Sequence, residues 1–446
     1  MWTQGRVSNV SAPSSERILR DRIATASKNL DDYLALANLL HDAHKFEEAV
    51  STLRGALLLP LTEASRAATL TLLGWYVYDA TGDRKEPVSL GLMAVALTEG
   101  LESIEAVLAK AKALSLIADC TWIADPSRST DAATLALPLF ARVIENTPPG
   151  DRETRYEIQL QSAILSCLLQ RTDDASIQCR EALQLASNQA QRVECLTELG
   201  FIERTAGLLV DARETLTNAI HSDGVAAEAL VRPYYELGIT EEALGKLPEA
   251  RAKFRSAVTI LQDDPALPRA YLPELFRLIG AVSYELDDME EAAVMYGLAV
   301  ESYSVRDPFY WSSLSWLAYC QWNLGQLDAA RANFERLVRS SAAAEDVRET
   351  ANFVLRSVRL EIAVSLYESE RYAECIVECE SLLVPLQEDD EIYTRTLLLL
   401  AHAYMESGNS VSARRYYERL LAHSSASPAQ RASADESLAR LGRPRC

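Results

Sequence analysis

The sequence lacks any long apolar run. None of its apolar stretches approaches the roughly 20 residues that a membrane-spanning helix requires. The first fifteen residues, 1–15, are rich in serine and have no apolar core of the kind found in secretion signals. These absences exclude direct membrane insertion and predict a cytoplasmic protein.

Cysteine pairs at short spacing are also missing. The 446-residue chain has eight cysteines, with no CxxC pair and no compact framework spacing. Most of them lie among Leu, Ala and Ile at helix-core positions, where an unpaired cysteine acts as a small apolar side chain. The pattern predicts a reducing compartment rather than a disulfide scaffold. The cysteines are Cys120, Cys167, Cys179, Cys195, Cys320, Cys375, Cys379 and Cys446.

Positive charge is scarce. Lys and Arg total 44 against 64 Asp and Glu, which gives a formal net charge of −20. Such a charge repels nucleic acid and anionic lipid, so neither is expected as a partner. Any charged partner should be basic. The alternative interpretation is that the charge serves only solubility, and the sequence leaves it open.

Catalytic and metal-binding motifs are missing too. There is no GxSxG, and no GxGxxG follows a strand. Gly245-Lys246 resembles the end of a phosphate loop, but Leu247 stands where Ser or Thr is needed. His41 and His44 form an HxxH, for which a turn histidine beside solvated acids is the preferred interpretation over a metal site. We therefore predict no catalytic, cofactor-binding or metal-binding residues, and no enzyme.

What the chain does contain is a repeat. Apolar residues make up 48% of the sequence, and Leu and Ala dominate them. Four segments share one pattern: a large aliphatic residue, Gly or Ala, a turn, Ala, a bulky residue four positions on, and a small or aliphatic residue three further. The i, i+4, i+7 spacing places the last three on one face of a helix. The segments are 199–219, 237–257, 279–299 and 317–337.

The pattern predicts pairs of antiparallel helices that approach closely where side chains are small. The first helix offers Gly200, Gly238, Gly280 and Ala318, and the second offers Ala212, Ala250, Ala292 and Ala330. We expect the space between one hairpin and the next to be filled by Leu216, Phe254, Tyr296 and Phe334. The reversal between the two helices should fall at Gly207, Gly245, Asp287 and Gly325.

These residues resemble the tetratricopeptide repeat family, whose unit carries Leu-Gly on its first helix and Ala…Phe…Ala on its second. Further units are marked by the triplets Ala49, Leu53, Ala56; Ala175, Cys179, Ala182; Cys375, Cys379, Leu382; and Ala413, Tyr417, Leu420. From 175 on, the second-helix markers are 37, 38, 42, 38, 45 and 38 residues apart. These steps exceed the family's usual repeat of about 34 residues, so the chain resembles its long-repeat members.

The resemblance implies an all-α fold. It would be a right-handed α-α superhelix of about ten helical hairpins closed by a C-terminal capping helix. The predicted segments are a flexible stretch at 1–15, a first hairpin at 16–62, degenerate hairpins at 63–150, a regular solenoid at 151–424, and the capping helix with its tail at 425–446.

In this family the first helices line a concave face, which implies a row of partner-binding residues. The row comprises Phe201, Tyr235, Arg277, Tyr284, Tyr319, Trp322, Tyr367 and His402. One interpretation is a groove for a partner segment, because aromatic residues and Arg are enriched at binding hot spots. The other is that winding of the superhelix buries the row against neighbouring first helices. Both stay open.

The carboxylate clamp of the co-chaperone members is not expected. Asn38 occupies one matching position, but Leu34 stands where the clamp needs Lys. The leading hypothesis is an interaction scaffold or adaptor for a protein or peptide of basic or amphipathic character. The alternative is a sensory protein that binds a signalling peptide or small ligand and acts on an effector in trans. A helper that positions an enzyme encoded elsewhere is a third. The sequence does not indicate the oligomeric state.

Overall fold

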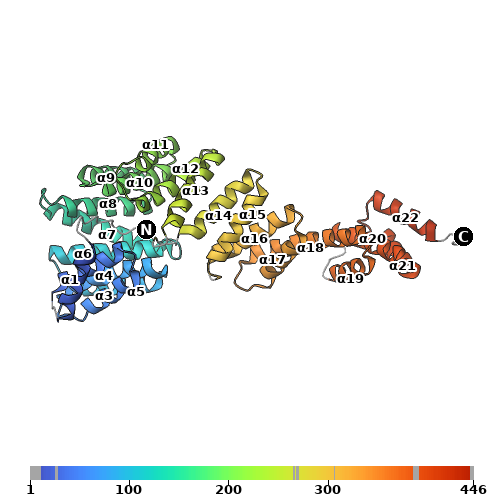
Figure 1. Cartoon of the computed structure of the whole chain (residues 1–446), viewed down its shortest axis with the longest axis horizontal. Coiled ribbons are helices and arrows are strands. Elements are labelled where there is room, and N and C mark those ends of the chain that lie inside the picture. The colour runs from blue at the N-terminus through green and yellow to red at the C-terminus, as the bar shows by residue number, and fades with distance from the viewer. Residues whose placement is uncertain are drawn as a thin grey trace. The chain divides into compact units, whose positions relative to one another are not determined.

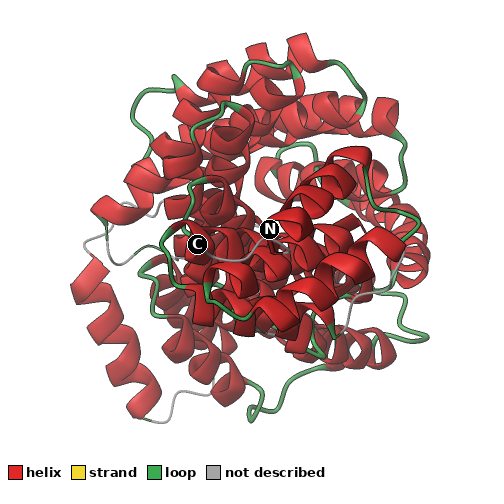
Figure 2. Ribbon diagram, turned by 90° about the vertical axis from the view of Figure 1, so that its right-hand side faces the viewer, coloured by secondary structure: helices red, strands yellow, loops and turns green. Residues whose placement is uncertain are grey.

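The computed structural model describes residues 12–25, 29–264, 267, 271–305, 307–384 and 391–441. Within these ranges it has 22 α-helices, one short 3-10 helix and no strand (Figure 2). The predicted all-α class is confirmed. The predicted segment limits at residues 15, 62, 150 and 424 stay predictions, and residues 1–11 and Cys446 lie outside the described residues.

The chain divides into two compact units, residues 1–275 and 276–446 (Figure 1). The helices of unit 1 are α1 Ala12–Ala24, α2 Leu30–Asp42, α3 Phe46–Ala56, α4 Glu63–Thr81, α5 Lys85–Leu97, α6 Ile104–Thr121, α7 Pro126–Asn146, α8 Arg152–Leu168, α9 Thr172–Leu185, α10 Gln189–Thr205, α11 Leu209–Ile220, η1 Ala227–Leu230, α12 Val231–Ala243 and α13 Leu247–Asp263.

The helix α14 crosses the limit between the units, and the rest follow in unit 2. They are α14 Leu272–Glu285, α15 Met289–Ser302, α16 Pro308–Asn323, α17 Leu327–Arg339, α18 Glu345–Glu368, α19 Tyr372–Leu383, α20 Glu391–Glu406, α21 Ser410–Ala422 and α22 Pro428–Leu441.

Helices α2 to α21 pair in chain order as ten hairpins, from α2 with α3 to α20 with α21. The prediction of about ten hairpins is confirmed. Within unit 1, the first helix of one hairpin also packs against the first helix of the next, as α8 does on α10 and α10 on α12. The helix α22 packs on α21 and α20, where the sequence predicts a capping helix.

The second helices bury the face that the repeat pattern predicts. Every residue of the eight marker triplets is at most 2% exposed, including Phe254, Phe334 and Tyr417. Cys375 and Cys379 occupy two of these positions and are fully buried, so their assignment to the core is confirmed. A local spacing of i, i+4, i+7 thus identifies the core of each hairpin.

The glycines of the first helices permit close approach within a hairpin. A Cβ atom on Gly238 would lie 2.4 Å from the Phe254 ring, and one on Gly200 would lie 2.4 Å from Leu216 Cγ. The expectation that the bulky residues fill the space between hairpins was therefore incomplete. They pack first on the small residue of their own hairpin, and Tyr296 in addition stacks on Trp316 of the next.

The turns between paired helices use left-handed backbone. The predicted turn residues Gly207, Gly245, Asp287 and Gly325 have φ between 61° and 80°. Glu370 adopts φ 59° at the corresponding place between α18 and α19, although it has a Cβ atom. Left-handed backbone costs a non-glycine residue roughly 1–2 kcal/mol.

Glu370→Gly should raise the free energy of unfolding by about 0.5–1 kcal/mol. The strain is relieved, and the greater freedom of glycine in the unfolded chain offsets part of the gain. Urea denaturation followed by circular dichroism measures the change. The matched control is Glu349→Gly in the exposed interior of α18, which should cost about 1 kcal/mol. A loss of stability in both variants would contradict the account of the turn.

Candidate protein-binding site

The eight residues of the predicted row all lie on first helices. Phe201 is on α10, Tyr235 on α12, Arg277 and Tyr284 on α14, Tyr319 and Trp322 on α16, Tyr367 on α18 and His402 on α20. Each is partly exposed; none is fully buried and none is fully open to solvent. Two of the eight belong to unit 1 and six to unit 2.

The two aromatic residues of unit 1 are held by their own neighbours. The Arg204 guanidinium lies over the Phe201 ring, 5.2 Å from its centroid. Tyr235 meets Tyr271 edge to face at 5.8 Å between ring centroids. No ring contact joins Phe201 to Tyr235 among the described residues, so unit 1 presents no continuous aromatic surface along this row.

The same row of helices in unit 1 carries buried ion pairs instead. Arg232 on α12 bonds Glu198 on α10, and Arg204 on α10 bonds Glu236 on α12 at 2.8 Å. Glu198 and Glu236 are 4% and 5% exposed. Burial acts against the charge of Arg232, but the Glu198 carboxylate outweighs it and raises the pKa of Arg232. These four side chains form two ion pairs across α10 and α12.

A neighbouring carboxyl group on the same face has a pKa near neutral pH. The Tyr156 hydroxyl on α8 donates to Glu194 on α10 at 2.7 Å. Burial raises the pKa of Glu194 to about 7 from its ordinary 4.5, with the Glu198 carboxylate acting in the same direction and Arg232 opposing. The folded protein thus keeps a proton that the unfolded chain releases between these two values. Stability falls as the pH rises through this window.

Glu194→Gln should raise the free energy of unfolding at pH 8 by about 1–3 kcal/mol, because the amide keeps an acceptor for Tyr156 without a charge at this partly buried position. The variant should also lose the decline in stability between pH 5 and pH 7. Thermal unfolding at a series of pH values measures both effects. Glu301→Gln on the exposed surface of α15 is the control. Parallel pH profiles for Glu194→Gln and wild type would contradict the prediction.

Unit 2 differs, because its first helices carry rings that contact one another. Tyr284 on α14 meets Trp316 on α16 edge to face at 5.0 Å, Trp316 lies 5.9 Å from Tyr319, and Tyr319 lies 6.4 Å from Trp322. We call these four residues the aromatic cluster. The Trp322 indole N–H donates to Glu361 on α18 at 2.8 Å, which extends the surface to a third hairpin.

Trp316 was missed by the sequence prediction. It is 42% exposed and contacts both Tyr284 and Tyr319, so it lies at the centre of the cluster. The repeat pattern selected only the positions one and four places after Ala318. The spacing of Trp316, Tyr319 and Trp322 at intervals of three was the signal that could have found it, because residues three apart share a helix face.

The remaining row residues of unit 2 lie apart from these four rings. Tyr367 and His402 contact each other at 6.4 Å, and His402 also meets Tyr417 of the core at 5.5 Å. Burial lowers the pKa of His402, which favours the neutral ring. The Arg277 guanidinium lies 5.2 Å from the Phe309 ring. The structure therefore divides the predicted row into separate groups.

His41 of the HxxH motif and Asn38, which matches one position of the carboxylate clamp, both form contacts within the fold. His41 on α2 lies with Nε2 2.9 Å from Asp79 Oδ2 on α4 and stacks on Tyr76. The interpretation of a turn histidine beside solvated acids was wrong for His41, whose main partner is a half-buried acid of the next hairpin. The Tyr76 hydroxyl donates to Asn38 at 2.6 Å. The described residues hold no group of three or more His, Cys, Asp or Glu placed for a metal ion.

The family comparison matches the hairpin that holds most of the aromatic cluster. A tetratricopeptide repeat model matches residues 312–341, which span most of α16 and all of α17. The ten hairpins, with their small and bulky core positions, extend this pattern along the chain. The chain is a repeat protein of the tetratricopeptide type. In the described residues, no helix is both long enough and apolar enough to cross a membrane.

The comparisons with whole proteins give only distant likenesses. No curated protein matches it. Among solved structures, apo RapI is 12% identical with a TM-score of 0.48, covering 84% of this chain and 98% of its own. Human IFIT1, solved as a dimer with PPP-AAAA, is 17% identical with a TM-score of 0.36, covering 93% and 95%.

A third solved structure is a tetratricopeptide repeat protein from Parabacteroides merdae. It is 14% identical with a TM-score of 0.34, covering 64% of this chain and 99% of its own. At TM-scores below 0.5 these likenesses carry no information on the partner or activity of this chain.

Proposed function

We propose that this tetratricopeptide protein is a non-enzymatic interaction scaffold that binds a segment of another protein on the first helices of unit 2. The observation that carries the proposal is the aromatic cluster. Its four rings contact one another across α14 and α16, and Trp316 is 42% exposed at their centre. Trp and Tyr are the residues most enriched at interface hot spots, because they bury a large area at a small cost in side-chain entropy.

The surroundings of the cluster favour a basic amphipathic partner segment. Glu285 follows Tyr284 on α14 and is exposed, and Glu361 beside Trp322 is exposed as well. A helix that places an apolar stripe on the rings would bring its flanking side chains to these carboxylates. The net charge of −20 favours the approach of a basic segment over nucleic acid. We place this binding in the cytoplasm, following the cysteine pattern.

A pull-down from native lysate with three forms of the chain tests the proposal. The forms are wild type, Trp316→Ala/Trp322→Ala, and the control Phe353→Ala, which removes an aromatic side chain that is 62% exposed on α18. Circular dichroism first establishes that all three are folded. We expect a protein that wild type and Phe353→Ala retain and that the double variant loses.

Two other outcomes overturn the proposal. Retention of the same proteins by all three forms would show that the aromatic cluster is not the binding surface. Capture of no protein by wild type, together with a melting-point shift by a peptide or metabolite, would replace the scaffold with the sensory alternative.

A further inference from the structure

One polar position recurs in the hairpins. In three hairpins, the third residue after the small residue of the first helix bonds a polar side chain 12 positions later. The hydrogen bonds are Ser166 to Gln178, Thr215 to Glu203, and Asn333 to Gln321, each at 2.8 Å. Two of these first-helix residues, Ser166 and Glu203, are at most 3% exposed. Pairing satisfies polar groups that would otherwise be costly to bury.

In two hairpins, the preceding hairpin supplies a partner to this position. Arg180 on α9 donates to Glu203 on α10 at 3.2 Å, and Glu380 on α19 accepts from the Tyr404 hydroxyl on α20 at 2.6 Å. Arg180 and Glu380 both stand five residues after the small marker of their helix, Ala175 and Cys375. In these two hairpins the position is thus covered by a solvent-exposed side chain of the preceding second helix.

In the hairpin of α12 and α13 both partners are missing. The recurring position is Glu241, which is 7% exposed. Twelve positions on, the Lys253 ammonium instead lies 5.9 Å from the Tyr234 ring centroid. Five residues after Ala212 stands Thr217, where an arginine would be needed to match Arg180. Glu241 Oε2 accepts no hydrogen bond, but it forms an ion pair with Lys246, whose Nζ lies 3.9 Å away.

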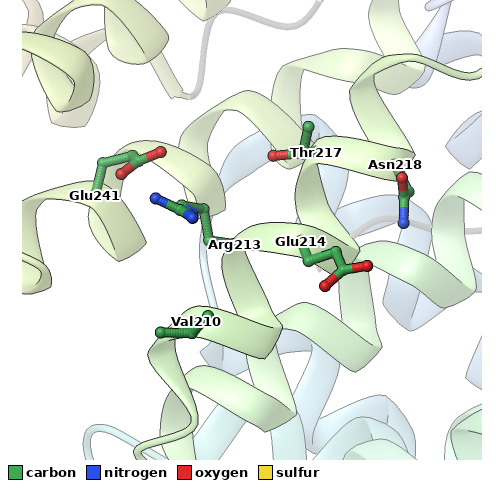
Figure 3. A pocket seen from close by; sticks show the side chains of 6 residues that line it. All are labelled: Val210, Arg213, Glu214, Thr217, Asn218 and Glu241. Atoms are coloured by element: carbon green, nitrogen blue, oxygen red, sulfur yellow. The ribbon is translucent and has the colours of Figure 1, made fainter.

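A cavity of about 380 Å³ opens at this place (Figure 3). Its lining comes from α11 and α12, and consists of Val210, Arg213, Glu214, Thr217, Asn218 and Glu241. The Arg213 side chain extends toward Glu241 in Figure 3, yet no ion pair or hydrogen bond of Arg213 is present within the described part of the chain. By the repeat register, the cavity corresponds to the place where the Arg180 guanidinium bonds Glu203 one hairpin earlier.

We propose that this cavity binds free arginine, with the guanidinium on Glu241 and the α-carboxylate on Arg213. In the preceding repeat a guanidinium, that of Arg180, bonds the corresponding carboxylate of Glu203. Guanidinium groups pair with carboxylates through two parallel hydrogen bonds, and the uncommitted charge of Arg213 offers the same pairing to the carboxylate of the ligand. The cavity is open to solvent, and five of its six lining residues are polar or charged. This site is separate from the aromatic cluster and does not rest on the proposed function.

Isothermal titration calorimetry of the full chain with L-arginine tests the proposal. Two analogues each remove one charge: agmatine lacks the carboxylate, and L-citrulline replaces the guanidinium by a neutral group. We expect saturable binding of L-arginine, at least tenfold weaker binding of agmatine, and no binding of citrulline. Absence of L-arginine binding at millimolar concentration would overturn the proposal. Equal affinity for arginine and agmatine would overturn the role of Arg213.

Three variants place the ligand in the cavity. Thr217→Arg copies the preceding repeat, so its own guanidinium should fill the space, abolish arginine binding and raise the melting temperature. The control Thr259→Arg adds the same side chain on the exposed surface of α13, outside the cavity, and should bind like wild type. Glu241→Gln should weaken binding at least tenfold, because the amide cannot balance a guanidinium charge. Undiminished binding by both Thr217→Arg and Glu241→Gln would show that arginine binds elsewhere.

Discussion

Arg232→Ala should lower the free energy of unfolding by about 3–5 kcal/mol, the cost of leaving a buried charge without its partner. Arg232 bonds Glu198, whose side chain is 6% exposed, and the pair joins α12 to α10 across two hairpins. The truncation leaves Glu198 with a charge that little water can reach. Urea denaturation followed by circular dichroism measures the loss.

A double variant separates the cost of the orphaned charge from the value of the pair. Arg232→Met/Glu198→Leu removes both charges and keeps most of the volume, so it should recover most of the lost stability. A cost below about 1 kcal/mol for Arg232→Ala would contradict the burial of this pair. A double variant no better than the single one would assign the loss to packing of the arginine stem instead.

Phe254→Ala should cost about 3–5 kcal/mol, the usual range for truncating a buried phenylalanine. The ring is fully buried and fills the space that Gly238 leaves on the first helix of the same hairpin. Phe254 packs between two closely spaced helices, so the backbone has little room to collapse into the gap that the ring leaves. The control is Phe353→Ala, whose side chain is 62% exposed and whose loss should cost less than about 0.5 kcal/mol.

The damage from Phe254→Ala should also be local. Each hairpin of a repeat protein contacts only its neighbours, so stability is close to a sum of hairpin and interface contributions. Native-state hydrogen exchange should lose protection in α12 and α13 and keep it in α2 and α3. A uniform loss across the chain would contradict the independence of distant hairpins.

The hairpins could be predicted from the sequence because their signal is local. A small residue, a turn and an i, i+4, i+7 face all fall within about 20 residues, and the buried triplets through Phe254 and Phe334 follow from that spacing. The turns at Gln170 and Glu370 gave a weaker signal, because a residue other than glycine adopts the left-handed backbone there.

The candidate site was less predictable because exposure on a first helix depends on the neighbouring hairpins. Trp316 lies between Tyr284 of one hairpin and Tyr319 of its own, and no local pattern shows which of these rings stays open to solvent. Phe201 fits the same sequence rule but packs under Arg204. The pairing of Arg232 with Glu198, 34 residues apart, likewise depends on how two hairpins stack.

Site-specific photocrosslinking in cells tests directly whether the aromatic cluster binds a partner protein. A photoreactive phenylalanine analogue is introduced at Trp316 in one form of the chain and at Phe353 in another, both of which are exposed aromatic positions of unit 2. Mass spectrometry then identifies the crosslinked proteins. We expect one protein to be crosslinked from position 316 through a basic amphipathic segment and not from position 353. No crosslink from position 316, or the same proteins from both positions, would contradict a binding surface at the aromatic cluster.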